Sequence, residues 1–166
     1  MARIMRILVP IDFSETSDLA LAYAKDLAEA LGASLHVLHV FEDPYVIGTF
    51  SPEVYGYVPE GWRETALQAA EENLLSRFPS SEQFRFNGSA QIVTGNAVKA
   101  TLSYADQEQI DLIVMGTHGR SGMAHLLIGS VTEKVVRAAS CPVLTIRHPQ
   151  AASERLGLQT AAVTAD

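Results

Sequence analysis

The chain has 166 residues, a formal net charge of −7 and 48% hydrophobic residues. This length fits one domain, and the apolar fraction is enough for a core that buries roughly 70% of the surface of the unfolded chain. The excess of negative charge argues against a protein whose main task is to bind nucleic acid, because the phosphate backbone needs a basic surface.

The first part of the chain alternates between strand and helix patterns. Residues 4–11 (IMRILVPI) predict a buried strand, and Ser14 is placed to cap the helix that follows it. Apolar residues then recur at helical spacing as far as Leu31, and Gly32 stands where a C-cap glycine belongs. Residues 34–41 (SLHVLHVF) predict the second strand.

A long loop is predicted over residues 42–61, which carry three prolines and three glycines without any period. Six of the twelve aromatic residues of the chain lie between Phe41 and Trp62. We interpret this segment as a loop that folds onto the domain's own surface. A lid or a partner surface is the alternative, because clustered exposed aromatic residues indicate binding. A helix is predicted over residues 62–78.

The alternation continues in the second part of the chain. A third strand is predicted over 89–95, followed by a helix that Asn96 caps. Residues 111–116 (DLIVMG) are apolar almost throughout, as expected of a parallel strand covered on both faces. After a glycine-rich segment, a helix over 130–139 and a strand over 141–147 complete the pattern.

The pattern fades at the C-terminal end. We therefore predict one domain over residues 1–148 and a disordered tail over 149–166. Alternation of strands and helices predicts an α/β fold, with a single open parallel sheet of five strands, right-handed crossovers and helices on both faces.

In open parallel sheets the ligand site lies beyond the carboxyl ends of the strands, where the strand order reverses. The residues that follow the first, second and fourth strands are therefore candidates. They include Asp12, which is either a turn former that bonds its own backbone or a carboxylate that accepts hydrogen bonds from a ribose hydroxyl or a base amine. We favour the second interpretation. The residues after these strands are Pro10, Ile11 and Asp12, then Val40 and Phe41, and then Met115, Gly116, Thr117, His118 and Gly119.

Four glycines fall within the fourteen residues 116–129, and Gly129-Ser130 stands directly before a predicted helix. The first N–H groups of a helix have no partners within it, and the helix dipole favours an anion there. The hydroxyls of Ser130 and Thr132 and the charge of Arg120 would add to such a site. This segment therefore predicts a backbone cradle for phosphate.

Other nucleotide and hydrolase motifs are absent from the sequence. There is no G-x4-G-K-S/T, no G-x-G-x-x-G after the first strand and no G-x-S-x-G. These absences argue against a P-loop NTPase, a dinucleotide Rossmann site and a hydrolase nucleophile elbow.

At these residues the chain resembles the universal stress protein family, from residue 3 to about residue 148. The resemblance is carried by ILVPIDFSETSDLALAYA, GASLHVLHV, DLIVMGTHGRSG and GSVTEKVVRAASCPVL. The ATP-binding subgroup carries G-x2-G-x9-G-S/T, and Gly116, Gly119, Gly129 and Ser130 match it without a gap. The resemblance implies a Rossmann-like sheet of the adenine nucleotide alpha-hydrolase kind, with strand order 3-2-1-4-5.

The resemblance also implies roles for individual residues. Pro10, Ile11 and Asp12 would line the adenosine pocket, Val40 would meet adenine through its main chain, and Met115 and Gly116 would border the ribose. The phosphates of ATP, ADP or AMP, with Mg²⁺ or Mn²⁺ as a companion, would lie among the remaining residues. These are Gly119, Arg120, Gly129, Ser130, Val131 and Thr132. From its place in the glycine-rich segment, His118 is a further candidate to reach the phosphates, and a surface hydrogen bonder is the alternative for it.

Three functions are compatible with this pattern. The first is a regulator that binds ATP and is recognised by a protein partner during stress. The second is a slow ATPase or self-phosphorylating enzyme that uses Ser121, Ser130 or Thr132, and the third is an adaptor without nucleotide. The intact glycine motif argues against the adaptor. Phosphoryl transfer needs a positioned nucleophile, and no dedicated base is visible, so we favour the regulator. His36 and His39 receive no role.

Further features of the sequence bear on the cellular location and the oligomeric state. No apolar run approaches the roughly 20 residues of a membrane span, and residues 1–12 lack a signal-peptide pattern. The single cysteine, Cys141, fits a reducing compartment and is interpreted as a small buried residue rather than a catalytic thiol. We therefore expect a cytoplasmic protein. The last strand would lie at a sheet edge, and the resemblance implies a homodimer through its residues Val143, Leu144, Thr145 and Ile146.

Overall fold

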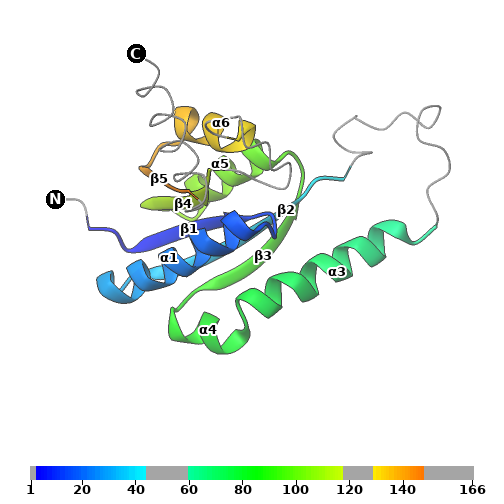
Figure 1. The fold of residues 1–166 in the computed structure, drawn as a ribbon, viewed down its shortest axis with the longest axis horizontal. Coiled ribbons are helices and arrows are strands. Elements are labelled where there is room, and N and C mark those ends of the chain that lie inside the picture. The colour runs from blue at the N-terminus through cyan, green and yellow to red at the C-terminus, as the bar shows by residue number, and fades with distance from the viewer. Residues whose placement is uncertain (1–2, 44–59, 118–128, 148–166) are drawn as a thin grey trace, which may run out of the picture.

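The computed structural model describes residues 3–43, 60–117 and 129–147. Its centre is a sheet of five parallel strands in the order β3-β2-β1-β4-β5, which confirms the predicted fold class and strand order (Figure 1). The strands are β1 (Arg6–Ile11), β2 (Ser34–Phe41), β3 (Ser89–Thr94), β4 (Leu112–Gly116) and β5 (Val143–Ile146).

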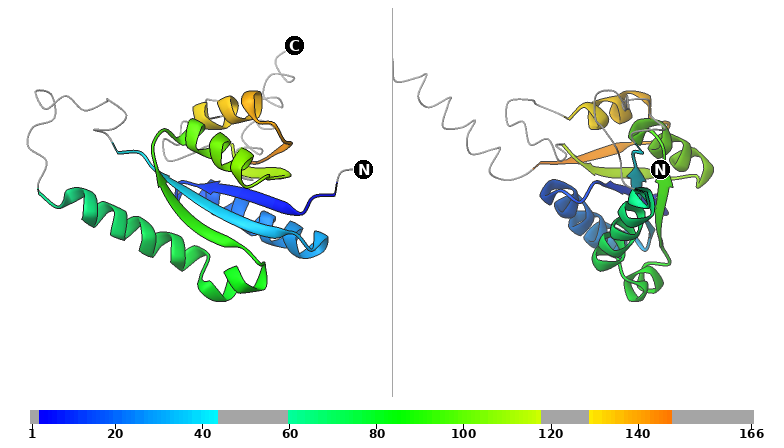
Figure 2. Two further views of the ribbon diagram at one scale, coloured as in Figure 1. Left: turned by 180° about the vertical axis from the view of Figure 1, so that it is seen from behind. Right: turned by 90° about the vertical axis from the view of Figure 1, so that its right-hand side faces the viewer.

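Helices cover both faces of this sheet. The end-on view of Figure 2 places α1 and α3 on one face and α5 and α6 on the other. The helices are α1 (Glu15–Leu31), α3 (Trp62–Arg77), α4 (Ser80–Arg85), α5 (Ala97–Gln107) and α6 (Ser130–Ala138). Within the described ranges, no helix is long and apolar enough to cross a membrane.

Alternation along the strands divides the core into two clusters. Side chains such as Val9 and Val37 are fully buried beneath α1 and α3. Neighbours of the opposite parity, such as Leu8 and Leu38, are fully buried beneath α5 and α6. Successive side chains of a strand point to opposite faces, so a sheet covered on both sides needs apolar residues at every position. This requirement explains the apolar sequences of the central strands.

The ends of α1 form as the sequence predicts. The Ser14 hydroxyl accepts a hydrogen bond from the N–H of Ser17, and Gly32 ends the helix in the left-handed conformation, with φ of 64°. A glycine adopts this conformation without the steric cost that a Cβ would bring. The helix is therefore fixed at the point where β1 ends, next to the predicted site.

Helix α4 was not predicted from the sequence. It begins after Pro79, and the residue before that proline, Phe78, leaves the helical region with φ of −139° and ψ of 74°. A proline disfavours the helical conformation of the residue before it, so α3 ends here and a second helix of six residues starts. The prediction of a single helix over 62–78 followed directly by a strand was incomplete.

Some predictions concern residues outside the described ranges. These are the interior of the aromatic loop (44–59), the glycine-rich segment that contains His118, Gly119, Arg120 and Ser121, and the tail from residue 149.

Candidate functional site

A cavity of about 750 Å³ opens at the carboxyl ends of the strands. It lies where β1 separates the part of the sheet that continues to β2 from the part that continues to β4, which is the switch point of the strand order. Every predicted site residue that the structure describes lines it: Pro10, Ile11, Asp12, Val40, Met115, Gly116, Gly129, Ser130, Val131 and Thr132. His118, Gly119 and Arg120 lie outside the described residues.

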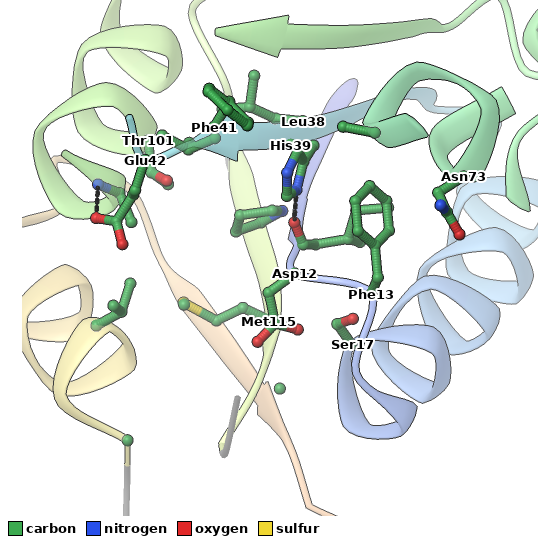
Figure 3. A pocket seen from close by; sticks show the side chains of 18 of the residues that line it. Asp12, Phe13, Ser17, Leu38, His39, Phe41, Glu42, Asn73, Thr101 and Met115 are labelled. Atoms are coloured by element: carbon green, nitrogen blue, oxygen red, sulfur yellow. Dashed lines mark hydrogen bonds between the residues drawn. The ribbon is translucent and has the colours of Figure 1, made fainter. Parts of the chain in front are cut away.

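Four helices that follow strands line the cavity: α1, α3, α5 and α6. Two of them, α1 and α5, are capped by side chains. Ser14 caps α1. The Asn96 side chain accepts from the Lys99 N–H of α5 at 3.2 Å, and Glu42 Oε1 accepts from the Ala97 N–H at 2.9 Å (Figure 3). Carboxylate and amide oxygens thus already meet the first N–H groups of α5.

Helix α6 differs from α1 and α5. Its N-cap is Gly129, which has no side chain to accept a hydrogen bond, and no described side chain caps its first turn. The acidic residue of that turn, Glu133, is exposed and bonds Arg137 at 3.1 Å. Helix α3 also begins at a glycine, Gly61, and its half-buried Trp62 lines the cavity, but Gly61 itself is exposed and the first turn carries the exposed Glu64. The N-terminus of α6 is therefore the one best suited to an anion in this cavity.

A set of hydrogen bonds fixes the start of α6 against the strands. The Gly129 N–H donates to the carbonyl of Thr117, and the Thr117 N–H donates to the carbonyl of Ile146 at 2.8 Å. Thr132 is 4% exposed, and its hydroxyl donates to the Gly116 carbonyl at 2.8 Å. This hydroxyl was expected to serve a phosphate, but in the structure its proton holds α6 against β4.

The packing of α1 against β4 explains why position 116 is a glycine, without reference to a ligand. A Cβ at this position would lie 2.9 Å from Thr16 Cγ2 and 3.0 Å from the Thr16 carbonyl oxygen. Helix α1 therefore packs against β4 at a distance that only glycine allows. The sequence analysis attributed this glycine to close approach of a ligand, and the structure adds helix packing as a cause.

Asp12 combines the two interpretations that the sequence left open. Its Oδ1 accepts from the Ser14 N–H at 3.1 Å and from the Ser14 hydroxyl, so it does form a local turn. The same side chain lines the cavity, between Met115 and Phe13 in Figure 3. Ser14 therefore fixes the orientation of a carboxylate that a ligand would meet.

One wall of the cavity was not predicted from the sequence. His39 is 5% exposed, its Nδ1 bonds the Ile11 carbonyl at 2.9 Å, and its ring stacks on Phe13 with centroids 4.2 Å apart. Phe41 and Trp62 follow on the same side, with centroids 6.2 Å apart. Period-two alternation from Val37 could have predicted that His39 and Phe41 point toward α1 and α3. Phe41 is among the residues that the sequence placed at the strand ends. The missed lining residues are Phe13, Ser17, Leu38, His39, Glu42, Trp62, Ala66, Ala69, Ala70, Asn73, Ala97 and Thr101.

The second strand histidine, His36, lies on the other face of the sheet and away from the cavity. Its Nδ1 lies 3.0 Å from the Tyr104 hydroxyl and 3.3 Å from the Ser89 hydroxyl. Burial lowers the pKa of His36 below its usual 6.5, and the charge of Arg6 acts in the same direction against the charge of Glu108. This histidine is thus held neutral by its surroundings near pH 7.

Cys141 is partly buried just before β5. Burial raises the pKa of its thiol, which disfavours the thiolate that a nucleophile needs. Within the described parts of the chain, no group of three or more His, Cys, Asp or Glu side chains is arranged to hold a metal ion.

Comparison with known proteins decides the family. The family model described as the universal stress protein family matches residues 3–147. The chain belongs to this family. A universal stress protein of Thermus aquaticus is 35% identical over 150 residues, which cover 85% of this chain and 97% of that protein.

Solved structures agree with this assignment. The structure of universal stress protein MJ0577 of Methanocaldococcus jannaschii gives a TM-score of 0.73 at 27% identity, over 89% of this chain and 98% of that chain. A universal stress protein of Archaeoglobus fulgidus, solved in complex with dAMP, shares the fold, with a TM-score of 0.59 at 21% identity over 87% and 99% of the two chains.

Proposed function

We propose that this universal stress protein binds an adenine nucleotide, ATP first among them, in the cavity at the strand ends and works as a nucleotide-dependent regulator. The observation that carries the proposal is the start of α6. Among the described residues, α1 and α5 have side-chain caps, whereas α6 has none because its N-cap is Gly129. The other uncapped helix that lines the cavity, α3, has an exposed N-cap, Gly61, and carries Glu64 in its first turn. A phosphate is the anion that the N-terminus of α6 suits.

The positions of the other residues suggest how the nucleotide lies. The phosphates would meet the N–H groups of Ser130, Val131 and Thr132, and the glycine motif adds Gly119, Arg120 and His118 to this group. The adenosine would extend toward β1 and β2, where Asp12 and Val40 line the cavity. An adenine nucleotide is a ligand that a member of the family holds, since the Archaeoglobus fulgidus protein was solved with dAMP.

We favour binding over efficient catalysis because the carboxylates of the cavity are already engaged. Asp12 accepts from Ser14, and Glu42 accepts from the N–H of Ala97. They are the only Asp or Glu residues among the described lining residues. Neither is placed as a spare general base. Incubation of the purified protein with ATP and Mg²⁺ tests this point, because turnover or a phosphorylated product would favour the enzyme.

A charge placed at the start of α6 tests the phosphate position. Gly129→Asp gives α6 a favourable N-cap and a carboxylate where the phosphate would lie. We expect stability to stay equal or rise, while ATP affinity falls at least tenfold in calorimetry. The matched control is Asn96→Asp, which adds the same charge at the capped N-terminus of α5, beside Ala97 of the same cavity.

Two outcomes separate the interpretations. A loss of affinity in Gly129→Asp but a change below threefold in Asn96→Asp supports phosphate at α6. An equal loss in both variants would mean that the added charge acts on the whole cavity, and an unchanged affinity in Gly129→Asp would contradict the proposed position.

Asp12 is tested by Asp12→Asn, which keeps the Oδ1 acceptor for Ser14 and removes the charge. We expect weaker binding of ATP. Comparison with 2′-deoxy-ATP and inosine triphosphate then shows which group Asp12 meets, because the first lacks the 2′-hydroxyl and the second lacks the base amine. A variant that binds all three nucleotides as the wild type does would remove Asp12 from the site.

The homodimer also stays a proposal. In the described sheet β5 pairs with β4 alone, and its four residues Val143–Ile146 are only partly buried. An apolar edge strand is a surface for pairing with another strand. Light scattering at micromolar concentration tests it, and a strict monomer would contradict it. Cytoplasmic location and the recognition of the bound form by a protein partner likewise remain predictions.

A further inference from the structure

Phe13 has a backbone conformation that its side chain does not favour. Its φ is 66°, in the left-handed region that glycine adopts freely and a bulky residue avoids. The residue stands directly after Asp12 and lines the cavity. Strained backbone of this kind persists only where the surroundings hold it, and it gathers at ligand sites.

Two neighbouring side chains, His39 and Arg77, contact the ring of Phe13. The imidazole of His39 stacks on it with centroids 4.2 Å apart and planes inclined by 27°. The guanidinium of Arg77 lies over the ring, 5.1 Å from its centroid. A cation over the face of an aromatic ring is attracted by the negative charge of that face. Figure 3 shows Phe13 beside His39 at the edge of the cavity.

Arg77 is itself held in place, although it does not line the cavity. It belongs to the last turn of α3, and its Nε and Nη2 donate to the two carboxylate oxygens of Asp18 on α1, at 2.6 and 3.3 Å. This paired geometry fixes the plane of the guanidinium, which a lysine could not reproduce. The pair therefore joins α3 to α1 directly over Phe13.

The same contacts fix three consecutive residues. His39 bonds the carbonyl of Ile11, Ser14 bonds the carboxylate of Asp12, and both His39 and Arg77 contact the ring of Phe13. We propose that Arg77, acting through Phe13, is a positioning residue that sets the orientation of Asp12 in the nucleotide pocket. This inference rests on the proposed function of the pocket.

The chain offers a matched control for this role. Arg85 lies over the ring of Phe86, also 5.1 Å from its centroid, and pairs with Glu29 of α1. That contact has the same chemistry as the Arg77 contact but includes no residue of the cavity. Arg77→Met and Arg85→Met each remove one cation from one ring. Trp62, the only tryptophan of the chain, lines the cavity, so its fluorescence reports ATP binding alongside calorimetry.

We expect Arg77→Met to weaken ATP binding five- to tenfold, and Arg85→Met to change it less than twofold. The decisive measurement is the ATP affinity of the double variant Arg77→Met/Asp12→Asn. A purely structural role of Arg77 would leave the loss of affinity caused by Asp12→Asn unchanged. If Arg77 positions Asp12, the fold-loss of ATP affinity caused by Asp12→Asn is at least three times smaller in the Arg77→Met background than in the wild type.

Three results would overturn the inference. Arg77→Met could lower the urea midpoint without weakening ATP binding, which would make Arg77 a structural residue only. The fold-losses of ATP affinity in Arg77→Met and Asp12→Asn could simply multiply in the double variant, which would mean that Arg77 does not act through Asp12. A wild-type protein that binds no ATP would contradict the proposed function itself, and the positioning role with it.

Discussion

The hydrogen bond from Thr132 to Gly116 gives a prediction that separates a role in folding from a role in binding. The bond is 2.8 Å long, and Thr132 is 4% exposed. Thr132→Val keeps the shape of the side chain but leaves the Gly116 carbonyl without this donor. Because Gly116 is only partly buried and lines the cavity, we expect loss of this hydrogen bond to cost about 0.5–1.5 kcal/mol. A loss of each 1 kcal/mol lowers the melting temperature of a domain of this size by about 2–4 °C.

The assay is urea denaturation with Thr65→Val as the control. The Thr65 hydroxyl donates to the Gly61 carbonyl at 3.0 Å in the first turn of α3, where both residues are exposed and water can replace the bond. We expect the control to lose less than about 0.5 kcal/mol, as most surface substitutions do. Well below its melting temperature, Thr132→Val should bind ATP within threefold of the wild type. Unchanged stability together with a tenfold loss of affinity would refute this reasoning and return the hydroxyl to the phosphate.

Other predictions follow from single contacts. Gly116→Ala places a Cβ 2.9 Å from Thr16 Cγ2, so urea denaturation should show a loss of about 1–3 kcal/mol, and a loss below 0.5 kcal/mol would contradict the packing described. The pKa of His36 is lower in the folded protein than in the unfolded chain, so the unfolded chain takes up the proton more readily and stability falls as the pH drops below about 6.5. His36→Asn should therefore lose less stability than the wild type between pH 7.5 and pH 5.5, and an equal loss would exclude His36 as the cause. Because burial raises the pKa of the Cys141 thiol, a thiol reagent at pH 7.4 should label it more slowly than free glutathione, and faster labelling would show an activated thiol.

The fold was predictable because its signals are local and agree with one another. The apolar runs that became β1, β2 and β4, the Ser14 cap and the C-cap Gly32 each specify an element without reference to distant contacts. Strand order came from the family resemblance rather than from periodicity. Helix α4 was missed because it has only six residues and no buried side chain, so no hydrophobic period marks it.

The part of the site formed by the strand ends was predicted from the sequence, and the wall that contains Phe13 and His39 was not, for a physical reason. The residues that directly follow strands, such as Asp12 and Gly116, can be located once the strands are known. Phe13, His39 and Arg77 meet only in three dimensions, because they come from the turn after β1, from β2 and from α3. The use of the Thr132 hydroxyl also depends on the distance between α6 and β4, which sequence spacing does not specify.

The most direct test of the account is the nucleotide that the purified wild-type protein carries and binds. The protein would be denatured, the supernatant separated by chromatography, and the stripped and refolded protein titrated with ATP by calorimetry. The account predicts a co-purified adenine nucleotide or ATP binding with a micromolar Kd or tighter, at one site per chain. No nucleotide in the supernatant and no heat of binding at millimolar ATP would contradict it.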